Sequence, residues 1–157
     1  MLFRSNHLIL ANFNQTWKLS ERFVVTWARA LAKHPNARLW LLDPGETGRR
    51  QLLACAAQQG VTRPEEAIRF AQRVDPQKHI DRLALADLAL DQLPCSSHTT
   101  AADALWAGVP VLTMYGNRFA GCVGGAMVKE VDEQEFIENG LDDYELRLNA
   151  LIANPAE

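Results

Sequence analysis

The sequence predicts an α/β protein built on a doubly wound parallel sheet. Short apolar runs alternate with stretches of helical periodicity of about ten to fifteen residues, which is the pattern of repeated βαβ units. The apolar runs contain few polar side chains, as strands do when helices cover both faces of their sheet. Because crossovers between parallel strands are right-handed, the helices are expected on both faces. The 157 residues are 48% hydrophobic and show no linker or internal repeat, so we expect a single domain over 1–157.

Apolar runs that end at turn residues are the expected strands. The run "ARLWLLD" is almost uninterrupted, and Pro44 and Gly45 end it. The run "VPVLTM" follows a turn at Gly108. The expected strands cover 7–13, 37–43, 67–74, 88–93 and 109–114.

Helical periodicity fills the intervals between these strands. Ser20 is a suitable N-cap for a helix in which Phe23, Trp27 and Leu31 share one face. That helix must end before Pro35, which disfavours helical geometry in the preceding residue. The other helices are expected over 47–59, 77–86, 99–107, 118–130, 133–139 and 142–153.

Several bulky or acidic side chains are expected to have structural roles only. The four tryptophans are expected to pack, with Trp106 anchoring its helix to the sheet. Cys55 lies within a helical pattern and is expected to be buried. The acidic residues between 130 and 135 are expected to form a solvated helix start.

Composition excludes several classes of protein. The net charge is −3 and no basic stripe is visible, which argues against a nucleic-acid partner. No apolar run approaches the roughly 18 residues of a membrane span. The first ten residues, "MLFRSNHLIL", lack the long apolar segment of a signal peptide. The three cysteines are odd in number and have no CxxC spacing, which argues against disulfides or a zinc site and favours the cytoplasm.

A polar loop follows the expected fourth strand and leads directly into a helix. In parallel sheets, ligands bind beyond the carboxyl ends of the strands. His98, Thr99 and Thr100 stand where the helix begins, and its unpaired N–H groups and dipole favour an anion there. The arrangement suits a phosphate or pyrophosphate, with Asp103 one turn further on, able to accept bonds from ribose hydroxyls. The alternative is that the two threonines are ordinary helix caps and His98 is a surface residue.

A second polar loop follows the first expected strand, at the same edge of the sheet. It contains Gln15 and Lys18, three residues apart. Lys18 is expected to face the start of the helix that carries the two threonines, where its ammonium group would stabilise charge on a departing phosphate. The alternative is a solvated lysine that precedes a helix.

The stretches "FNQTWKLS", "DQLPCSSHTTAADALWAGVPVLTM" and "GNRFAGCVGGAM" together resemble the C-terminal half of the O-GlcNAc transferase catalytic region, glycosyltransferase family 41. The resemblance extends from about residue 7 to 153. Bacterial members usually carry tetratricopeptide repeats before this region. The family has the GT-B fold, in which two Rossmann-like domains enclose a cleft, and the second domain holds the nucleotide sugar. Plant relatives that transfer fucose have a threonine run where His98 stands, so His98 favours N-acetylglucosamine.

The resemblance assigns roles to residues on both loops. Gln15 and Lys18 match residues that contact the diphosphate, and Lys18 would stabilise the departing UDP. His98, Thr99 and Thr100 match the family's diphosphate-binding motif.

The resemblance also implies contacts with the nucleoside and the sugar. Asp103 matches a ribose-binding aspartate, and His79 and Arg82 match residues beside the uracil and the ribose. Backbone groups that read the uracil edge and a thiol near the sugar pocket complete the expected site: Val74, Asp75 and Cys95.

The implied reaction is an inverting transfer of N-acetylglucosamine from UDP to serine or threonine hydroxyls of an acceptor protein. Charge develops on UDP, where a cation and a helix N-terminus can stabilise it without a metal or another cofactor. No acidic pair resembles a DxD metal-nucleotide motif. The catalytic N-terminal half and the repeats are absent from this chain, so the chain alone is expected to bind UDP weakly and to turn over nothing.

Two local departures from the family pattern keep other functions open. Ser96 and Ser97 stand where the family usually has Asn-Gly, and Gly121 and Cys122 stand where it commonly has Ser-Arg. A non-catalytic interaction or scaffold module derived from the same fold is therefore one alternative. A glycosyltransferase that uses another UDP-sugar, such as UDP-glucose, is another.

Overall fold

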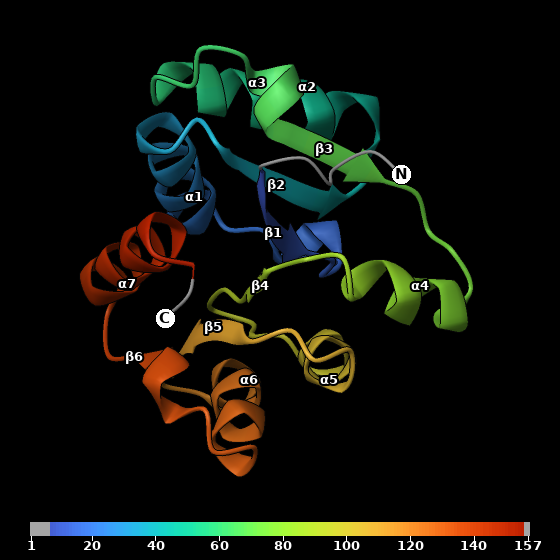
Figure 1. The fold of residues 1–157 in the computed structure, drawn as a ribbon, viewed down its shortest axis with the longest axis vertical. Helices are drawn as coiled ribbons and strands as arrows, with labels where there is room; N and C mark the ends of the chain where they lie inside the picture. The colour runs from blue at the N-terminus through green and yellow to red at the C-terminus, as the bar shows by residue number, and fades with distance from the viewer. Residues whose placement is uncertain (1–6, 156–157) are drawn as a thin grey trace.

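The computed structural model describes residues 7–155 and shows a six-stranded parallel sheet between two layers of helices (Figure 1). The strands follow the order β3-β2-β1-β4-β5-β6, and every neighbouring pair is parallel. This confirms the predicted doubly wound α/β fold. The strands are β1 (Leu8–Asn12), β2 (Ala37–Leu42), β3 (Ile68–Ala71), β4 (Leu88–Leu90), β5 (Val111–Met114) and β6 (Ile137–Glu138).

Two clusters of buried side chains lie on opposite faces of the sheet. The helices of the first cluster are α1 (Glu21–Lys33), α2 (Gly45–Gln58), α3 (Pro64–Ala67) and α7 (Leu141–Ala153). The helices of the second cluster are α4 (Pro76–Leu83), α5 (Thr99–Trp106) and α6 (Phe119–Glu130). Two 3-10 turns complete the described chain: η1 (Thr16–Lys18) and η2 (Gln134–Phe136).

The chain changes direction across the sheet between β1 and β4. From β1 the chain winds outward through β2 to β3, then returns to place β4 on the other side of β1. The connections that leave the carboxyl ends of β1 and β4 therefore lead to opposite faces. Such a switch point is where α/β sheets open a crevice for ligands.

A buried polar chain joins the first helical layer to the end of β4. The indole Nε1 of Trp27 lies 3.2 Å from the hydroxyl of Tyr144, which donates in turn to the carbonyl oxygen of Asp91 at 3.0 Å. Burial raises the pKa of Tyr144, so its phenol keeps its proton. Helices α1 and α7 are thus fastened to the residue that follows β4.

Some predicted element boundaries were wrong. The expected strands 67–74 and 88–93 end early, at Ala71 and Leu90, where the chain turns toward polar partners. The helix expected over 133–139 is the turn η2 followed by the two-residue strand β6. Ser20 takes the N-cap position of α1, but its side chain caps no N–H group in the described part of the chain.

The packing predictions were right for Trp27, which is fully buried, and wrong for two other tryptophans. Trp17 is 75% and Trp106 is 85% exposed. Trp106 does not anchor α5, because that helix faces the sheet with the small side chains of Ala101 and Ala104. Trp106 instead lines an apolar groove of about 690 Å³ between α5 and α6, together with the exposed ring of Phe119. Cys55 is half-buried rather than buried.

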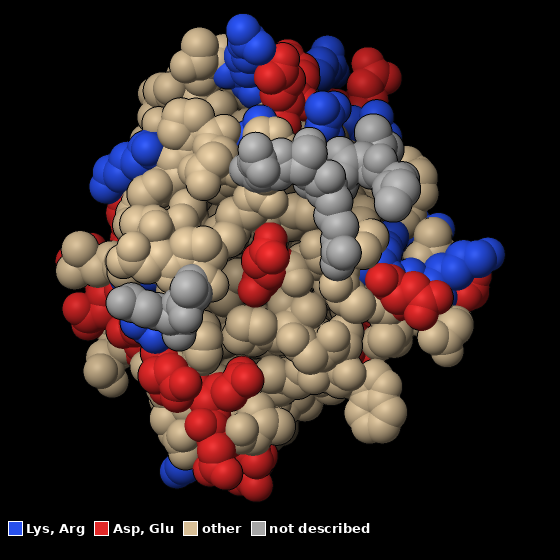
Figure 2. Space-filling model, viewed as in Figure 1, with Lys and Arg blue, Asp and Glu red and all other residues tan. Residues whose placement is uncertain are grey.

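Charged side chains are unevenly distributed over the face seen in Figure 2. Acidic residues gather over the lower part of the molecule, where Figure 1 shows β6, α6 and α7. Basic residues lie at the top of this view, near α2 and α3, and at its right, near α4. Glu133 and Glu135 lie at the start of the 3-10 turn η2, as the N-cap and in its first turn, whereas Glu130 ends α6 and Asp132 lies in the turn between them. Within residues 7–155, no helix has both the length and the apolar character to cross a bilayer.

Candidate functional site

The loops after β1 and β4 meet at the carboxyl edge of the sheet. Lys18, at the end of η1, directs its ammonium Nζ to the carbonyl oxygen of Ser96 at 3.2 Å. Ser96 lies two residues before His98, so the cation stands beside the start of α5. The structure therefore brings Lys18 to the loop that the sequence predicted it would face.

Helix α5 begins as predicted. His98 takes its N-cap position, and Thr99 and Thr100 form its first turn. The His98 carbonyl accepts from the N–H groups of Ala101 and Ala102, while helix geometry leaves the first amides of α5 without intrahelical acceptors. Thr99 is exposed and His98 is half-buried. These groups form a short, electropositive rim next to Lys18.

Asn14 links the two loops, and sequence reasoning missed it. Its side-chain Oδ1 accepts from the Thr100 hydroxyl at 2.7 Å, and its Nδ2 donates to the Ser97 hydroxyl at 2.6 Å. Asn14 is only 3% exposed. The Thr100 proton is therefore committed to Asn14, so Thr100 offers oxygen lone pairs rather than a donor to a ligand. The sequence did offer one signal for Asn14: two asparagines lie close together where an apolar strand ends, since Asn12 is the last residue of β1 and Asn14 follows two residues later.

A cluster between α4 and α5 unites three of the predicted residues. The Nε2 atom of His79 lies 3.7 Å from Oδ2 of Asp103, and Nε of Arg82 donates to His79 Nδ1 at 3.1 Å. The guanidinium carbon of Arg82 lies 4.2 Å from the ring centroid of Phe13, at the end of β1. The structure thus gathers His79, Arg82 and Asp103 between α4 and α5, next to the end of β1.

Burial is the main cause that lowers the pKa of His79, and the positive charge of Arg82 lowers it further. Asp103 acts in the opposite direction, with a smaller effect. The imidazole is therefore neutral at pH 7. Since Nδ1 accepts from Arg82, the ring proton lies on Nε2 and points toward Asp103. Asp103 keeps its acceptor capacity, because 3.7 Å exceeds a hydrogen bond.

The loop between β3 and α4 approaches η1 from the other side. Arg73 Nη2 donates to Oε1 of Gln15 at 2.6 Å, a cationic contact that sequence reasoning did not predict. Val74 and Asp75 are exposed at the start of α4. The Asp75 carboxylate accepts from the N–H of Lys78 at 3.1 Å and so caps the helix. Gln15, Val74 and Asp75 thus lie on neighbouring loops.

The remaining predicted residue, Cys95, lies in the loop between β4 and α5. It is half-buried, and its Sγ atom lies 3.9 Å from the carbonyl oxygen of Ser96 that also binds Lys18. The thiol is therefore a neighbour of the ammonium group.

The two departures from the family pattern have local explanations. Ser97 is 3% exposed and its hydroxyl bonds to Asn14, so its side chain points into the protein and not toward a ligand. At Gly121 a Cβ atom would lie 3.0 Å from the Cα of Gly116 and 3.1 Å from the carbonyl oxygen of Pro94. A serine would not fit at residue 121 without a shift of backbone.

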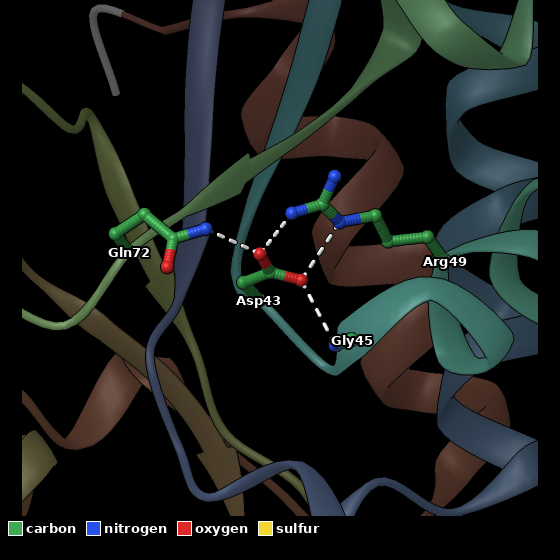
Figure 3. Close-up of polar contacts among 4 residues, drawn as sticks. All are labelled: Asp43, Gly45, Arg49 and Gln72. Carbon is green, nitrogen blue, oxygen red and sulfur yellow. Dashed lines mark hydrogen bonds and ion pairs between the residues drawn. The ribbon is translucent and has the colours of Figure 1, made fainter.

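A polar cluster at the end of β2 is satisfied within itself (Figure 3). The carboxylate of Asp43 accepts from the guanidinium of Arg49, from the amide of Gln72 and, at 2.9 Å, from the N–H of Gly45. The bond from Arg49 is the largest cause that holds the pKa of Asp43 well below its usual range. This cluster joins α2 to the loop after β3, and we assign it no ligand.

Comparison with known proteins gives a consistent result. A sequence model of Glycosyl transferase family 41 matches residues 3–153. A probable UDP-N-acetylglucosamine–peptide N-acetylglucosaminyltransferase SEC of Arabidopsis thaliana is 37% identical over 147 residues, covering 93% of this chain and 15% of the relative. The UDP-N-acetylglucosamine–peptide N-acetylglucosaminyltransferase of Caenorhabditis elegans is 28% identical, with 87% of this chain and 12% of the relative covered.

Solved structures show the same architecture. A Thermobaculum terrenum O-GlcNAc transferase mutant superposes with a TM-score of 0.87 at 25% identity, over 97% of this chain and 29% of that one. Anabaena Alr3699/HepE, solved with UDP and glucose, shares the fold with a TM-score of 0.61 at 20% identity, over 96% of this chain and 40% of that one. The chain thus spans less than half the length of each of these relatives.

Proposed function

Because this chain belongs to glycosyl transferase family 41, we propose that it is the UDP-sugar-binding domain of a protein O-linked N-acetylglucosaminyltransferase. The observation that carries the proposal is the approach of the Lys18 ammonium to the Ser96 carbonyl, at 3.2 Å. It places a cation beside the N-terminus of α5, where a diphosphate would find backbone N–H groups as well.

The diphosphate is assigned to the rim between the two loops. Lys18 stabilises the charge that develops on UDP when the bond between the anomeric carbon and the phosphate oxygen breaks. The amides of Thr99 and Thr100 supply further donors, and His98, whose Nε2 faces the carbonyl oxygen of Ala120 at 3.4 Å, borders the same rim. Gln15, held by Arg73 at 2.6 Å, stands at the outer side of the same rim.

The nucleoside is assigned to the cluster between α4 and α5. Asp103 accepts from the ribose hydroxyls, since its carboxylate is not neutralised by a charged histidine. His79 and Arg82 line the ribose and the uracil, and the exposed backbone of Val74 and Asp75 reads the uracil edge. Cys95, next to the Lys18 ammonium, borders the sugar.

The proposed reaction is inverting and independent of metal. An acceptor hydroxyl attacks the anomeric carbon opposite UDP, a new carbon–oxygen bond forms, and UDP departs with the electron pair. The acceptor protein and the group that removes its hydroxyl proton are assigned to parts of the enzyme outside this chain, the catalytic half and the tetratricopeptide repeats. This chain alone binds UDP and turns over nothing, and the cytoplasm stays our prediction for its location.

The test is a titration of the chain with UDP, followed through its backbone amide signals. We expect the signals of Thr99, Thr100 and Asp103 to shift, while those of the Asp43 cluster stay in place. Competition between UDP-N-acetylglucosamine and UDP-glucose then decides the sugar. No movement of these amides at millimolar UDP would contradict the proposal.

The groove between α5 and α6 favours one alternative, a non-catalytic interaction module. Trp106 and Phe119, both 85% exposed, flank an apolar surface whose lining shares no residue with the proposed UDP site. Such surfaces are typical of contacts with another protein. This alternative predicts that the titration with UDP leaves every amide signal unchanged.

A further inference from the structure

A buried carboxylate lies directly behind the loop that leads into α5. Asp91, the first residue after β4, is 1% exposed. Its Oδ1 accepts from the backbone N–H groups of Ser97 at 2.6 Å and Gln92 at 2.7 Å. Its Oδ2 accepts from the Thr113 hydroxyl at 2.7 Å. The side chain of Asp91 thereby links the end of the loop of residues 91–97 to its beginning, and it also links this loop to β5.

Helix α6 packs closely against the same carboxylate. A Cβ atom on Gly124 would lie only 2.3 Å from Oδ2 of Asp91, so this close approach requires glycine. The N–H of Gly124 donates to the hydroxyl of Ser96 at 3.1 Å, and that hydroxyl donates to the carbonyl oxygen of Ala120 at 3.0 Å. The loop is therefore held between Asp91 on one side and α6 on the other.

The partners of Asp91 are those of an ionised carboxylate. Its carboxylate oxygens accept three hydrogen bonds, from two amides and one hydroxyl. Burial raises the pKa of this carboxyl, and each of these hydrogen bonds acts against that rise. Hydrogen bonds to a charged acceptor are shorter and stronger than those between neutral groups. The short bond to Ser97 thus fixes the last amide before His98.

We propose that Asp91 is the positioning residue of the diphosphate site: its carboxylate holds the Ser97 amide, and so presents His98 and the first turn of α5 to the ligand. The inference rests on the proposed function. Asp91 does not touch the diphosphate in this arrangement, because it is enclosed by the loop, β5 and α6. It acts by fixing where the amides of the loop and helix stand.

Two substitutions distinguish a role of Asp91 in positioning the Ser97 amide from a general effect on the stability of the fold. Asp91→Ala removes both acceptors and leaves the Ser97 amide unpaired. Asp91→Asn keeps an oxygen that accepts from the two amides. Its NH₂ group can donate to the Thr113 hydroxyl, because that hydroxyl can donate its own proton to the Met114 carbonyl oxygen, at 3.5 Å, instead. Asp87→Ala is the matched control, because its carboxylate accepts from the Ile9 amide at 2.7 Å, at the opposite edge of the sheet.

The experiment measures the affinity of each variant for UDP and for uridine. We expect Asp91→Ala to lose UDP affinity by about tenfold or more, the scale of one charge-assisted hydrogen bond, with uridine affinity unchanged. Asp91→Asn should restore most of the affinity for UDP, and Asp87→Ala should leave the ratio of the two affinities as in the wild type. Equal losses for UDP and uridine, or an Asp91→Asn variant as weak as Asp91→Ala, would overturn the proposal.

Hydrogen exchange of the Ser97 amide gives a readout that does not depend on UDP. We expect strong protection in the wild type, reduced protection in Asp91→Asn and none in a folded Asp91→Ala chain. If Asp91→Ala does not fold, the comparison of wild type with Asp91→Asn still decides the matter, because identical exchange in both would refute the role of the carboxylate. A wild type that binds no UDP overturns the proposed function, and Ser97 exchange then decides the positioning role alone.

Discussion

The imidazole Nε2 of His79 on α4 lies 3.7 Å from the carboxylate Oδ2 of Asp103 on α5. The two residues are far apart in the sequence, and the sheet switch point brings their helices together. Because the histidine is neutral at pH 7, the pair is a polar contact and not an ion pair. Protonation of His79 at acidic pH therefore changes the charge of this contact.

Acidification is expected to destabilise the chain through His79. Its pKa is lowered in the folded state, so the unfolded chain binds a proton at a higher pH than the folded chain does. The free energy of unfolding should therefore fall as pH decreases from the ordinary histidine pKa of about 6.5 down through the lower folded value. Urea unfolding at several pH values, compared with His79→Gln, measures this contribution. A pH dependence that is identical in both proteins would count against it.

Removal of the Lys18 ammonium is expected to weaken UDP binding. Lys18→Ala should cost about 1–3 kcal/mol of binding free energy, the scale of a charge-assisted hydrogen bond. Isothermal titration calorimetry with UDP measures the loss. Lys33→Ala is the control, because Lys33 is exposed in the last turn of α1 and should leave the affinity unchanged. Equal affinities in the Lys18 variant and the wild type would remove Lys18 from the site.

Removal of the Asn14 amide is expected to separate the loops after β1 and β4. Asn14→Ala leaves the buried hydroxyl of Ser97 without its donor and the Thr100 hydroxyl without its acceptor. We expect a loss of about 1–3 kcal/mol in the free energy of unfolding, the usual cost of unsatisfied buried polar groups. Urea unfolding measures the loss, and Asn139→Ala, at an exposed position, serves as the control. A stability equal to that of the control would show that the bridge contributes nothing.

Restoring the family's serine at residue 121 is expected to destabilise this chain. In Gly121→Ser the new Cβ meets the backbone of Gly116 at 3.0 Å, so the two segments must separate. Overpacking of this kind costs about 1–3 kcal/mol. Gly140→Ser is the matched control, since its Cβ meets nothing closer than Asp143 Oδ2 at 3.9 Å and serine suits the N-cap of α7. Thermal unfolding should separate the two variants, and similar midpoints would contradict the expectation.

Chelation is expected to leave UDP binding unchanged. Lys18 and the N-terminus of α5 supply the positive charge that a divalent cation supplies in other nucleotide sites. Titrations with UDP in the presence of EDTA and of added Mg²⁺ should give the same affinity. A tighter interaction with Mg²⁺ would show that the metal-independent proposal is wrong.

The sequence was sufficient to predict the fold and the meeting of the two candidate loops at one edge of the sheet. Alternating apolar runs and helical segments predicted the parallel sheet, because parallel strands buried on both faces have few polar positions. The loop with His98 and the loop with Lys18 could be placed at one edge because each follows a strand. Strand β6 was missed, since two residues carry no periodicity.

The contacts that hold the site together could not be predicted in the same way. Asn14 and Thr100 are 86 residues apart, and their hydrogen bond depends on how two loops pack. The bond from Arg73 to Gln15 likewise joins loops from different strands. Trp106 was misplaced because helical periodicity shows which residues share a face, but not that Ala101 and Ala104 are the residues of α5 that are buried against the sheet.

The exposed indole of Trp17 has a practical consequence. Its ring centroid lies 5.8 Å from the Lys18 ammonium, while Trp27 is sealed in the core. The emission of these two fluorophores therefore differs in sensitivity to solvent and to solutes that arrive beside Lys18. A chain in which Trp17 is the sole tryptophan would carry its own optical reporter next to the phosphate rim, with no dye attached.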